Sequence, residues 1–400
     1  MRIRMNNNKL IGKLADLLIL LPIFWSFSGL FIFKDGDKIL VILTLLSLFI
    51  SIYKFKLNLI KENIKNYQFL LYIITLTLLS LVYKHYEGNH IINLRVSLSI
   101  IIIYLSTPKC YFKSKLFPFI LLVSSVAAAS YAFWQHDILH LARESWTLNA
   151  IPYSACCLIL FIIASIKTLY AKDSFEKVLL FLSSLVSLYA IFISETRGVL
   201  IAAIMQIILV SFVYFKSQTS KKVRLLAILF LTISLTSIIY VNKDRLIDNT
   251  LSEYSKIEKG NTNTSIGLRL DMWKAALLLV KDKPLLGYGN HYHSSIEKLY
   301  RENKISEALY HFPFQHFHNQ FLDYSVRYGV IGLLLLAIFI VLPSYLISNT
   351  SYTIEQKMII YMTSLGIIIA CLTDVPLSHK QVFALYSLIM LQTLNYKKGS

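Results

Sequence analysis

Long apolar runs constrain this chain more than any other feature of its sequence. Runs of about 15 to 22 residues recur along it, and this is the length that an α-helix needs to cross the hydrocarbon core of a bilayer. Hydrophobic residues make up 56% of the 400 residues and charged residues only 16%, a balance that a single soluble domain does not have. The sequence therefore predicts an all-α polytopic membrane protein.

The apolar runs predict about twelve membrane-spanning helices. Their predicted starting points are Leu14, Ile39, Asn66, Ile91, Leu116, Thr147, Phe175, Gly198, Val223, Phe321, Met358 and Gln381. We expect the first run to remain in the membrane, because Asp16 interrupts it and no small-residue cleavage site follows before Lys34.

Basic residues alternate between the two sides of these predicted helices. Short loops rich in Lys and Arg stay in the cytoplasm. The basic segments contain Arg2, Arg4, Lys9 and Lys13; Lys54, Lys56, Lys61 and Lys65; Lys109, Lys113 and Lys115; Lys216, Lys221, Lys222 and Arg224; and Lys397 and Lys398. The loops at 34–38 and 134–146 lack this excess, so we expect them on the far side, with both termini cytoplasmic. Topology thus explains the formal net charge of +18, and we expect no nucleic-acid partner.

The longest hydrophilic segment divides the chain into three parts. Predicted helices one to nine occupy residues 1–241, a large loop occupies residues 242–317, and predicted helices ten to twelve occupy residues 318–400. The number of preceding helices places the large loop outside the cytoplasm. Its lysines do not oppose this, since loops longer than about 60 residues are largely exempt from the charge rule.

Two helices are expected inside the large loop, and together they would form a lid on the membrane face. The first spans residues 268–281 and ends before Pro284. One face of it carries Arg269, Trp273, Ala276, Leu277 and Val280. The second is indicated by Ser294 and Glu297 in capping-box spacing, followed by a partial apolar face of Ile296, Leu299 and Tyr300.

His318 is the leading candidate for chemistry. It stands in the segment His311 to Gly332, HFPFQHFHNQFLDYSVRYGVIG, where the large loop enters a predicted span. An imidazole at that border can meet a water-borne and a lipid-borne substrate together. A histidine that only forms hydrogen bonds at the membrane interface is an equally simple interpretation. Other features of the sequence must therefore decide between a catalytic and a structural role.

Two arginines support a common site. Arg197 lies in a short turn between two predicted spans, and Arg269 opens the first helix of the large loop. Charges beside apolar runs are costly in hydrocarbon and tend to line a cavity. Arg197 also fits an interfacial anchor, and Arg269 also fits an ion pair with Asp or Glu. Both lie on the same predicted side as His318, whereas Arg95 and Asp16 have no accompanying motif and are interpreted as structural.

Metal and cofactor sites are not indicated by the sequence. His291-x-His293 and His316-x-His318 could supply ligands, but an HExxH motif and a nearby Asp/Glu cluster with ligand spacing are missing. A P-loop, a dinucleotide fingerprint and a GxSxG motif are missing as well. We therefore expect no metal and no cofactor, and an enzyme of this kind would use a pre-activated substrate.

Three motifs occur in a characteristic order. They are the turn Thr196-Arg197-Gly198, Arg269 in the helix before PLLGYG, and His318-Asn319 followed by Gly329-x-x-Gly332. From about Ser194 to Pro343 the chain resembles the O-antigen ligase family of Gram-negative bacteria, whose superfamily also holds O-antigen polymerases and protein O-oligosaccharyltransferases. The single dominant loop with the His-Asn pair at its end favours ligase over polymerase.

The resemblance implies glycosyl transfer at the periplasmic face of the inner membrane. The donor would be an O-antigen glycan on undecaprenyl diphosphate, and the acceptor a sugar hydroxyl of the lipid A core. His318 is implied as the general base of an inverting, metal-independent reaction, which the positive helix end beside it would help to keep neutral. The substrate-binding residues would be Arg197, Arg269 and Asn319, with His316, Arg301 and Trp273 as further candidates.

Other functions remain open at this stage. An O-antigen polymerase would use the same donor class, and a ligase acting on protein would differ in its acceptor. A polysaccharide or lipid flippase would need cationic residues along the membrane interior, whereas the candidates cluster on one side. A scaffold for envelope assembly would use the large loop to bind a partner.

Overall fold

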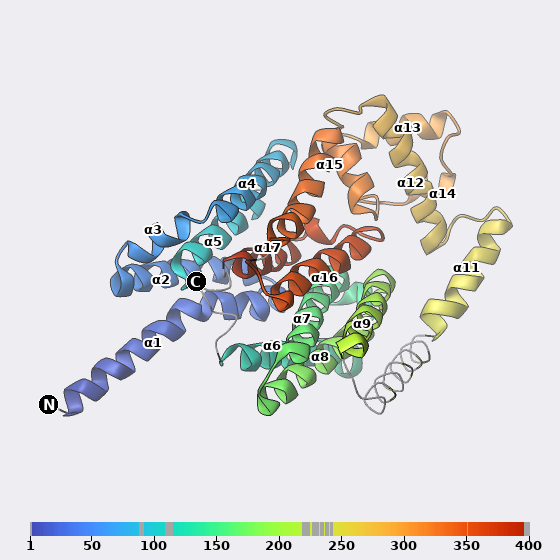
Figure 1. Cartoon of the computed structure of the whole chain (residues 1–400). Coiled ribbons are helices and arrows are strands. Elements are labelled where there is room, and N and C mark those ends of the chain that lie inside the picture. Colours follow the sequence, from blue (N-terminus) through green and yellow to red (C-terminus); the bar gives the residue numbers. More distant parts are fainter. Residues whose placement is uncertain are drawn as a thin grey trace.

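The computed structural model describes residues 2–87, 92–108, 115–217, 225, 232, 236, 240, 243–349 and 351–395. Within them the regular elements are helices, which confirms the predicted all-α class (Figure 1). The helices are α1 (Arg2–Phe27), α2 (Gly36–Phe55), α3 (Asn58–Ile64), α4 (Tyr67–Glu87), α5 (Ile92–Ser106), α6 (Phe117–Phe133), α7 (Ala150–Tyr170), α8 (Ser174–Ile193), α9 (Arg197–Ser217), α11 (Asn249–Glu258), α12 (Ser265–Asp282), α13 (His293–Arg301), α14 (Glu307–His311), α15 (Gln320–Ile347), α16 (Ile354–Cys371) and α17 (Lys380–Leu394).

Eight helices in the described part of the chain are long and apolar enough to cross a membrane. They begin at Gly12, Gly36, Phe117, Ala150, Ser174, Arg197, Gln320 and Ile354. Three further predicted spans match helices outside this set: α4, which forms a pair with α3 bent by 80°, the shorter α5, and the 15-residue α17. The predicted span that starts near Val223 lies largely outside the described residues.

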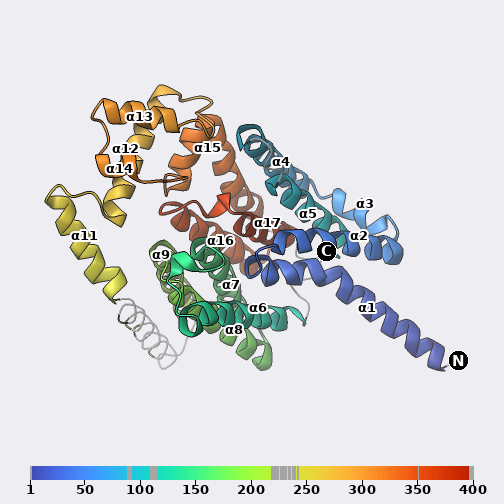
Figure 2. The ribbon, with the colours of Figure 1, turned by 180° about the vertical axis from the view of Figure 1, so that it is seen from behind.

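Helix α7 forms the centre of the bundle. Of its membrane-span residues 94% are buried, and it packs against α8, α9, α16 and α17. Small residues such as Ala155 and Ala164 on α7 are completely buried, which lets neighbouring backbones approach closely without lipid between them. In both views α7 lies between α6 and α8 on one side and α16 on the other (Figures 1 and 2).

Helices α12, α13 and α14 form a cap at the end of α15 (Figures 1 and 2). The cap has its own apolar core, separate from that of the bundle, in which Met272 of α12, Leu299 of α13 and Leu309 of α14 are buried. Val326 of α15 belongs to the same core. The cap is therefore packed onto the first turns of α15.

A break in α15 anchors the cap. Gly329 has φ of 63° within an otherwise helical run, a conformation that glycine adopts without the steric cost of a side chain. A Cβ there would lie 2.1 Å from the carbonyl oxygen of Leu285. The loop after α12 uses this space: the N–H groups of Tyr288 and Gly289 donate to the carbonyls of Val326 and Arg327, each at 2.8 Å. PLLGYG and Gly329-x-x-Gly332, separate motifs in the sequence, thus form one contact.

The two helices predicted in the large loop are present, with differences in detail. Helix α12 begins at a Thr264 cap and ends before Pro284. Its buried face is centred on Leu268, Met272 and Ala275, and Leu277, which we expected on the same face as Trp273, is 55% exposed. The buried face is turned by about one residue from the predicted face, and α12 packs against α15, α13 and α14.

The predicted capping box of the second helix is wrong. Helix α13 begins two residues earlier than expected, at His293, after Tyr292, whose side chain makes no cap hydrogen bond. Ser294 lies inside the helix and its hydroxyl donates to the carbonyl of His291. The helix is held by its apolar face instead, with Ile296 and Leu299 buried.

Candidate active site

The backbone holds His318 in an uncommon conformation. His318 has φ of 49°, a left-handed conformation that costs free energy in a residue other than glycine and is found preferentially at functional sites. Asn319, the next residue, caps α15 by accepting the N–H groups of Phe321 and Leu322 at 3.1 and 3.2 Å. Its amide also donates to the carbonyl of Leu372 at 3.2 Å. Asn319 thus fixes the turn that holds His318 and ties it to the end of α16.

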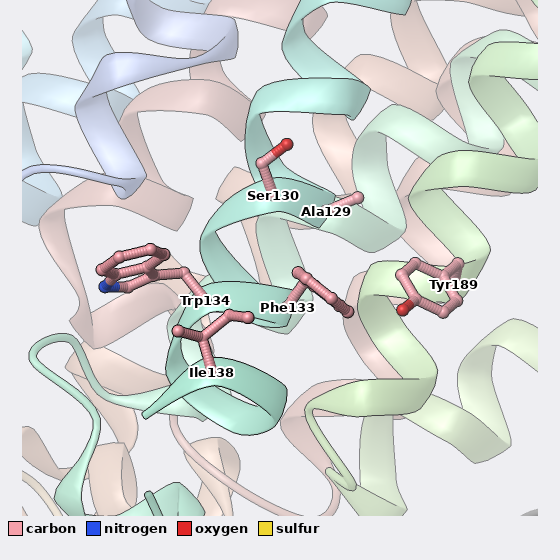
Figure 3. A pocket seen from close by; sticks show the side chains of 6 residues that line it. All are labelled: Ala129, Ser130, Phe133, Trp134, Ile138 and Tyr189. Atoms are coloured by element: carbon pink, nitrogen blue, oxygen red, sulfur yellow. The ribbon is translucent and has the colours of Figure 1, made fainter. Parts of the chain in front are cut away.

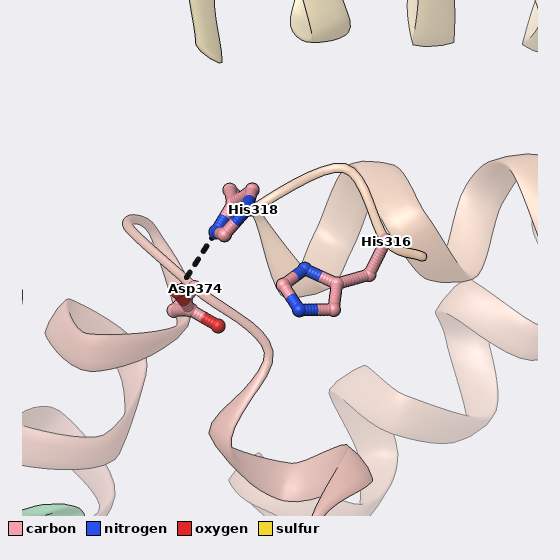
Figure 4. A group of neighbouring side chains, drawn as sticks. All are labelled: His316, His318 and Asp374. Carbon is pink, nitrogen blue, oxygen red and sulfur yellow. Dashed lines mark hydrogen bonds and ion pairs between the residues drawn. The ribbon is translucent and has the colours of Figure 1, made fainter. Parts of the chain in front are cut away.

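Asp374 is the partner of His318. It lies in the turn after α16, and its Oδ2 is 2.9 Å from Nδ1 of His318 (Figure 4). Its Oδ1 accepts the N–H of Val375 at 2.7 Å. The carboxylate side chain is 7% exposed. Burial alone would raise the pKa of Asp374, but the hydrogen bond with His318 and the nearby His316 lower it to about 2. Asp374 is therefore ionised at neutral pH.

Two more histidines surround this pair. The ring centroids of His316 and His318 are 4.3 Å apart, with an angle of 67° between the ring planes, and Figure 4 shows both rings near Asp374. Burial lowers the pKa of His316, and it lowers the pKa of His379 to about 4. Both of these rings are neutral at pH 7. Asp374 therefore has two uncharged imidazoles nearby in addition to its hydrogen-bond partner His318.

A divalent metal could be held here. One ligand atom from each of His316, His318 and Asp374 can be chosen so that all three lie within 4.8 Å of one another, and two imidazoles with a carboxylate are a common zinc donor set. Sequence spacing did not indicate this carboxylate, because Asp374 is 56 residues from His318. The same geometry also suits a histidine oriented by a carboxylate for proton transfer.

The Arg197 turn packs against the residue before Asp374. A Cβ on Gly198 would lie 1.7 Å from the Oγ1 of Thr373, so glycine is required there for α9 to approach the end of α16. This contact explains the predicted Thr196-Arg197-Gly198 motif in physical terms. It also places the start of α9 next to the His318–Asp374 pair.

Arg197 is held by a carboxylate of α11. Both terminal nitrogens of its guanidinium donate to Oε1 of Glu253 at 3.0 Å, and the two side chains are 17% and 15% exposed. The other oxygen of Glu253 accepts the N–H of Ile266 at 2.7 Å. Glu253 therefore links the N-terminus of α9 to that of α12, the helix that carries Arg269.

Helix α12 contacts the His318 loop through Trp273. The indole Nε1–H of Trp273 donates to the carbonyl of Phe317 at 3.0 Å, which precedes His318 in the chain. Arg269 is half-buried one turn earlier on the same helix. Arg301 is placed differently: its side chain is 76% exposed on α13 and forms an ion pair with Glu297. The structure thus brings Trp273 to the His318 loop and leaves Arg301 on the outer surface of the cap.

Sequence reasoning missed several residues of this site. Asp374 was not singled out, although a carboxylate between two apolar runs is itself an indication of function. Arg327 and Asp323 were also missed: they lie one turn apart on α15 with Nε and Oδ2 3.1 Å apart. His379 was missed because a lone histidine at a helix start carries no motif.

A hollow also lies away from the histidine cluster, on other helices. It lies between α6, the short π-helix Trp134–Ile138 and α8, and its volume is about 490 Å³. Its lining includes Phe133, Trp134, Ile138 and Tyr189 (Figure 3). These four side chains are 44% to 55% exposed. Apolar surface of this kind on a membrane helix faces lipid, and it offers few groups for acid–base chemistry.

The fold and the site together define a class: a multi-pass membrane protein with a His–Asp pair beneath a helical cap. Residues 182–337 match the family model described as O-antigen ligase, which confirms the predicted resemblance over that part of the chain. The match extends from α8 into α15 and includes Arg197, Arg269 and His318, whereas Asp374 lies beyond it.

A curated protein of Haemophilus influenzae, described as an uncharacterized protein, is 29% identical to this chain over 198 residues. The similarity covers 48% of this chain and 49% of that protein, so the chain spans about half the length of the curated relative it matches.

Proposed function

We propose that this protein is an O-antigen ligase. It transfers a glycan from undecaprenyl diphosphate to a sugar hydroxyl of the lipid A core. The observation that carries the proposal is the His318–Asp374 hydrogen bond of 2.9 Å, formed beside the Arg197 turn and beneath the cap that carries Arg269. The family match at residues 182–337 supports the same class of reaction.

His318 acts as the general base in this proposal. Because Nδ1 faces the carboxylate of Asp374, its proton is directed there, and Nε2 keeps the lone pair that a base needs. Nε2 takes the proton of the acceptor hydroxyl while its oxygen attacks the anomeric carbon. The bond from that carbon to the diphosphate oxygen breaks as the new bond forms, so the configuration inverts and the diphosphate leaves with the electron pair. Asp374 is a positioning residue, and its negative charge stabilises the imidazolium that develops. The negative charge of Asp374 favours the protonated form of His318, whereas the positive helix end beside His318 disfavours it. Only the helix end could be predicted from the sequence.

Arg197 and Arg269 bind the leaving diphosphate in this proposal. A guanidinium presents planar, forked donors that match phosphate oxygens without a metal. In the structure a carboxylate, Glu253, receives both donors of Arg197. Donor binding then exchanges this carboxylate for a phosphate, and Glu253 keeps the arginine oriented before the substrate arrives. Asn319 contributes by holding the His318 turn.

We further propose that the site faces the periplasm and that the protein lies in the inner membrane with both termini in the cytoplasm. The alternating basic loops support this orientation. Residues 242–317 then form the periplasmic segment between two membrane parts, 1–241 and 318–400. Membrane lipids and the two lipid-linked substrates are the expected partners.

The test of this function is transfer by the purified protein with lipid-linked donor and lipid A core acceptor. His318→Ala should leave the protein folded and able to bind donor, and should lower the rate by about 10² to 10⁴ if general-base catalysis is its role. His316→Ala, the matched control, should have a smaller effect. Transfer by the His318 variant at the wild-type rate would overturn the base assignment.

Chelation separates the two interpretations of the histidine cluster. If His316, His318 and Asp374 work without a metal, EDTA should leave the rate unchanged. Loss of activity in EDTA that added divalent metal restores would instead assign them as metal ligands and end the metal-free mechanism.

Polymerase activity is the alternative within the same superfamily. A strain that lacks the protein would then keep one glycan repeat on its lipid A core. Loss of all glycan from the core, with accumulation of lipid-linked polymer, is the result expected for a ligase.

A further inference from the structure

A polar pocket of about 360 Å³ lies beside the histidine cluster. Four segments line it: the link from α12 into α13, the loop before α15, the first turns of α15, and the turn between α16 and α17. Val375, one residue after Asp374, and His316, two residues before His318, are both on its wall. A group bound in this pocket therefore lies next to the proposed base.

The charges of the pocket are balanced within its walls. The Nε of Arg327 is 3.1 Å from Oδ2 of Asp323, and these side chains are 12% and 4% exposed. Arg327 also donates to the side chain of Asn290 and to the carbonyl of Gln315. Its positive charge is thus matched, and the wall residue Val375 directly follows the carboxylate residue Asp374 in the chain. A diphosphate would meet negative charge here, whereas a neutral ligand would not.

The lining suits hydroxyl groups. Two ring nitrogens of its histidines, Nδ1 of His316 and Nε2 of His379, are buried and form no hydrogen bond within the described residues. Carboxylate, amide and hydroxyl groups of Asp323, Asn290 and Ser378 line the same space. Sugar hydroxyls both donate and accept, so they can satisfy such a mixed lining. The ring of Tyr292 supplies an apolar surface, with the guanidinium of Arg327 5.2 Å from its centroid.

The size fits a single sugar ring with some water. At about 360 Å³ the pocket is near the lower end of the range for organic-ligand sites. Sites for larger organic ligands run from about 300 to 1,000 Å³. A long glycan chain does not fit inside.

We propose that this pocket binds the acceptor, as one neutral sugar ring whose reactive hydroxyl reaches His318. The proposal rests on the proposed function and extends it: donor diphosphate and acceptor sugar use separate places on either side of His318. Arg327 and Asp323 then act on the acceptor, whereas Arg197 and Arg269 act on the donor.

Two matched histidine variants test the assignment. His293 is exposed, lines the pocket and stacks on Tyr292, with ring centroids 4.3 Å apart. His311 is also on the cap and 66% exposed, and it is outside the lining. His293→Trp should fill the pocket and raise the KM for the lipid A core acceptor by roughly tenfold or more, about 1.4 kcal/mol. The donor KM and the rate at saturating acceptor should change little, and His311→Trp should match the wild type.

Direct binding gives a second measurement that is independent of turnover. Delipidated core oligosaccharide is added to the purified full-length protein in lipid nanodiscs, and its dissociation constant is measured for the wild type and both variants. Weaker binding by His293→Trp alone supports the pocket.

The outcomes separate the two proposals. If the wild type transfers glycan but His293→Trp has a normal acceptor KM and normal oligosaccharide binding, the pocket assignment is overturned and the ligase function stands. If the wild type transfers nothing to core acceptor, the ligase function fails. In that case oligosaccharide binding that His293→Trp abolishes still supports a sugar site, and equal binding by both proteins overturns it.

Discussion

Replacing Asp374 by Asn removes one charge and leaves the side chain nearly the same size. In the wild type the carboxylate accepts a hydrogen bond from the His318 ring at 2.9 Å and is 7% exposed. A hydrogen bond to a charged group contributes about 1.5 to 3 kcal/mol, and each 1.36 kcal/mol corresponds to a tenfold change in rate. If this interaction is made mainly as the imidazolium develops, Asp374→Asn should lower kcat by about 10-fold to 150-fold.

The pKa of Asp374 sets the pH range of this prediction. Because its folded-state pKa of about 2 is lowered from 3.8, the carboxylate is charged throughout any practical assay. The stability that it contributes, on the order of 2 kcal/mol, is present above about pH 4 and is lost as the pH falls towards 2. The defect of Asp374→Asn should therefore persist from pH 5 to pH 8.

The assay is transfer from lipid-linked donor to lipid A core at saturating substrates, as a function of pH, with thermal unfolding measured in parallel. A positioning role also predicts that the acidic limb of the pH–rate profile moves to lower pH in Asp374→Asn, since the imidazolium loses its counter-charge. A purely structural role would lower the melting temperature and leave the profile in place. Wild-type kcat in a folded Asp374→Asn protein would refute the reasoning. Asp35→Asn, the same change at a 61% exposed carboxylate, serves as the control.

Three further predictions concern the donor site, the orientation and the cap. Arg197→Lys and Arg269→Lys keep the charge but lose the fork, so each should reduce transfer nearly as much as the corresponding Ala variant; full activity of both Lys variants would remove the phosphate-binding assignment. In a Cys-free background, a single Cys at position 259 in place of Lys259 should react with an impermeant thiol reagent in cells with a permeabilised outer membrane, and one in place of Lys221 should not; the reverse pattern would exclude a periplasmic site. Gly329→Ala should lower the melting temperature by at least the equivalent of about 1 kcal/mol, because its φ of 63° is strained for alanine and its Cβ would collide with the loop after α12; a melting temperature equal to that of the wild type would contradict this.

The sequence predicted what depends on local pattern. Apolar runs predicted helix starts within a few residues, as at Leu116 for α6, because the length of a span is imposed by the bilayer. The helical period of α12 could be predicted from the sequence, but its buried face could not. Whether Ala275 or Leu277 is buried depends on which side of the helix packs against α15, and local sequence does not specify that side. Ser294 and Glu297 have capping-box spacing but form no cap, because α13 begins two residues earlier than that spacing predicts.

The site was predictable only where one motif contained it. His318 and Asn319 stood out through their neighbours and their position at the end of a hydrophilic segment. Asp374 is 56 residues away from His318 and meets it only because α16 returns along α15, a contact that spacing does not reveal. The need for glycine at position 198 could not be predicted for the same reason, because the residue that it contacts, Thr373, belongs to that distant turn.

The break at Gly329 has a consequence for how the molecule is assembled. The loop after α12 leaves the ribosome before α15 does, yet its N–H groups need the carbonyls of Val326 and Arg327. Until α15 has been synthesised and inserted, the cap has nowhere to dock and part of its apolar core is missing. A chain truncated before residue 320 should therefore keep its early helices in the membrane while the segment that becomes the cap stays sensitive to protease. The cap can dock and the site can form only when α15, the tenth predicted span, is in place.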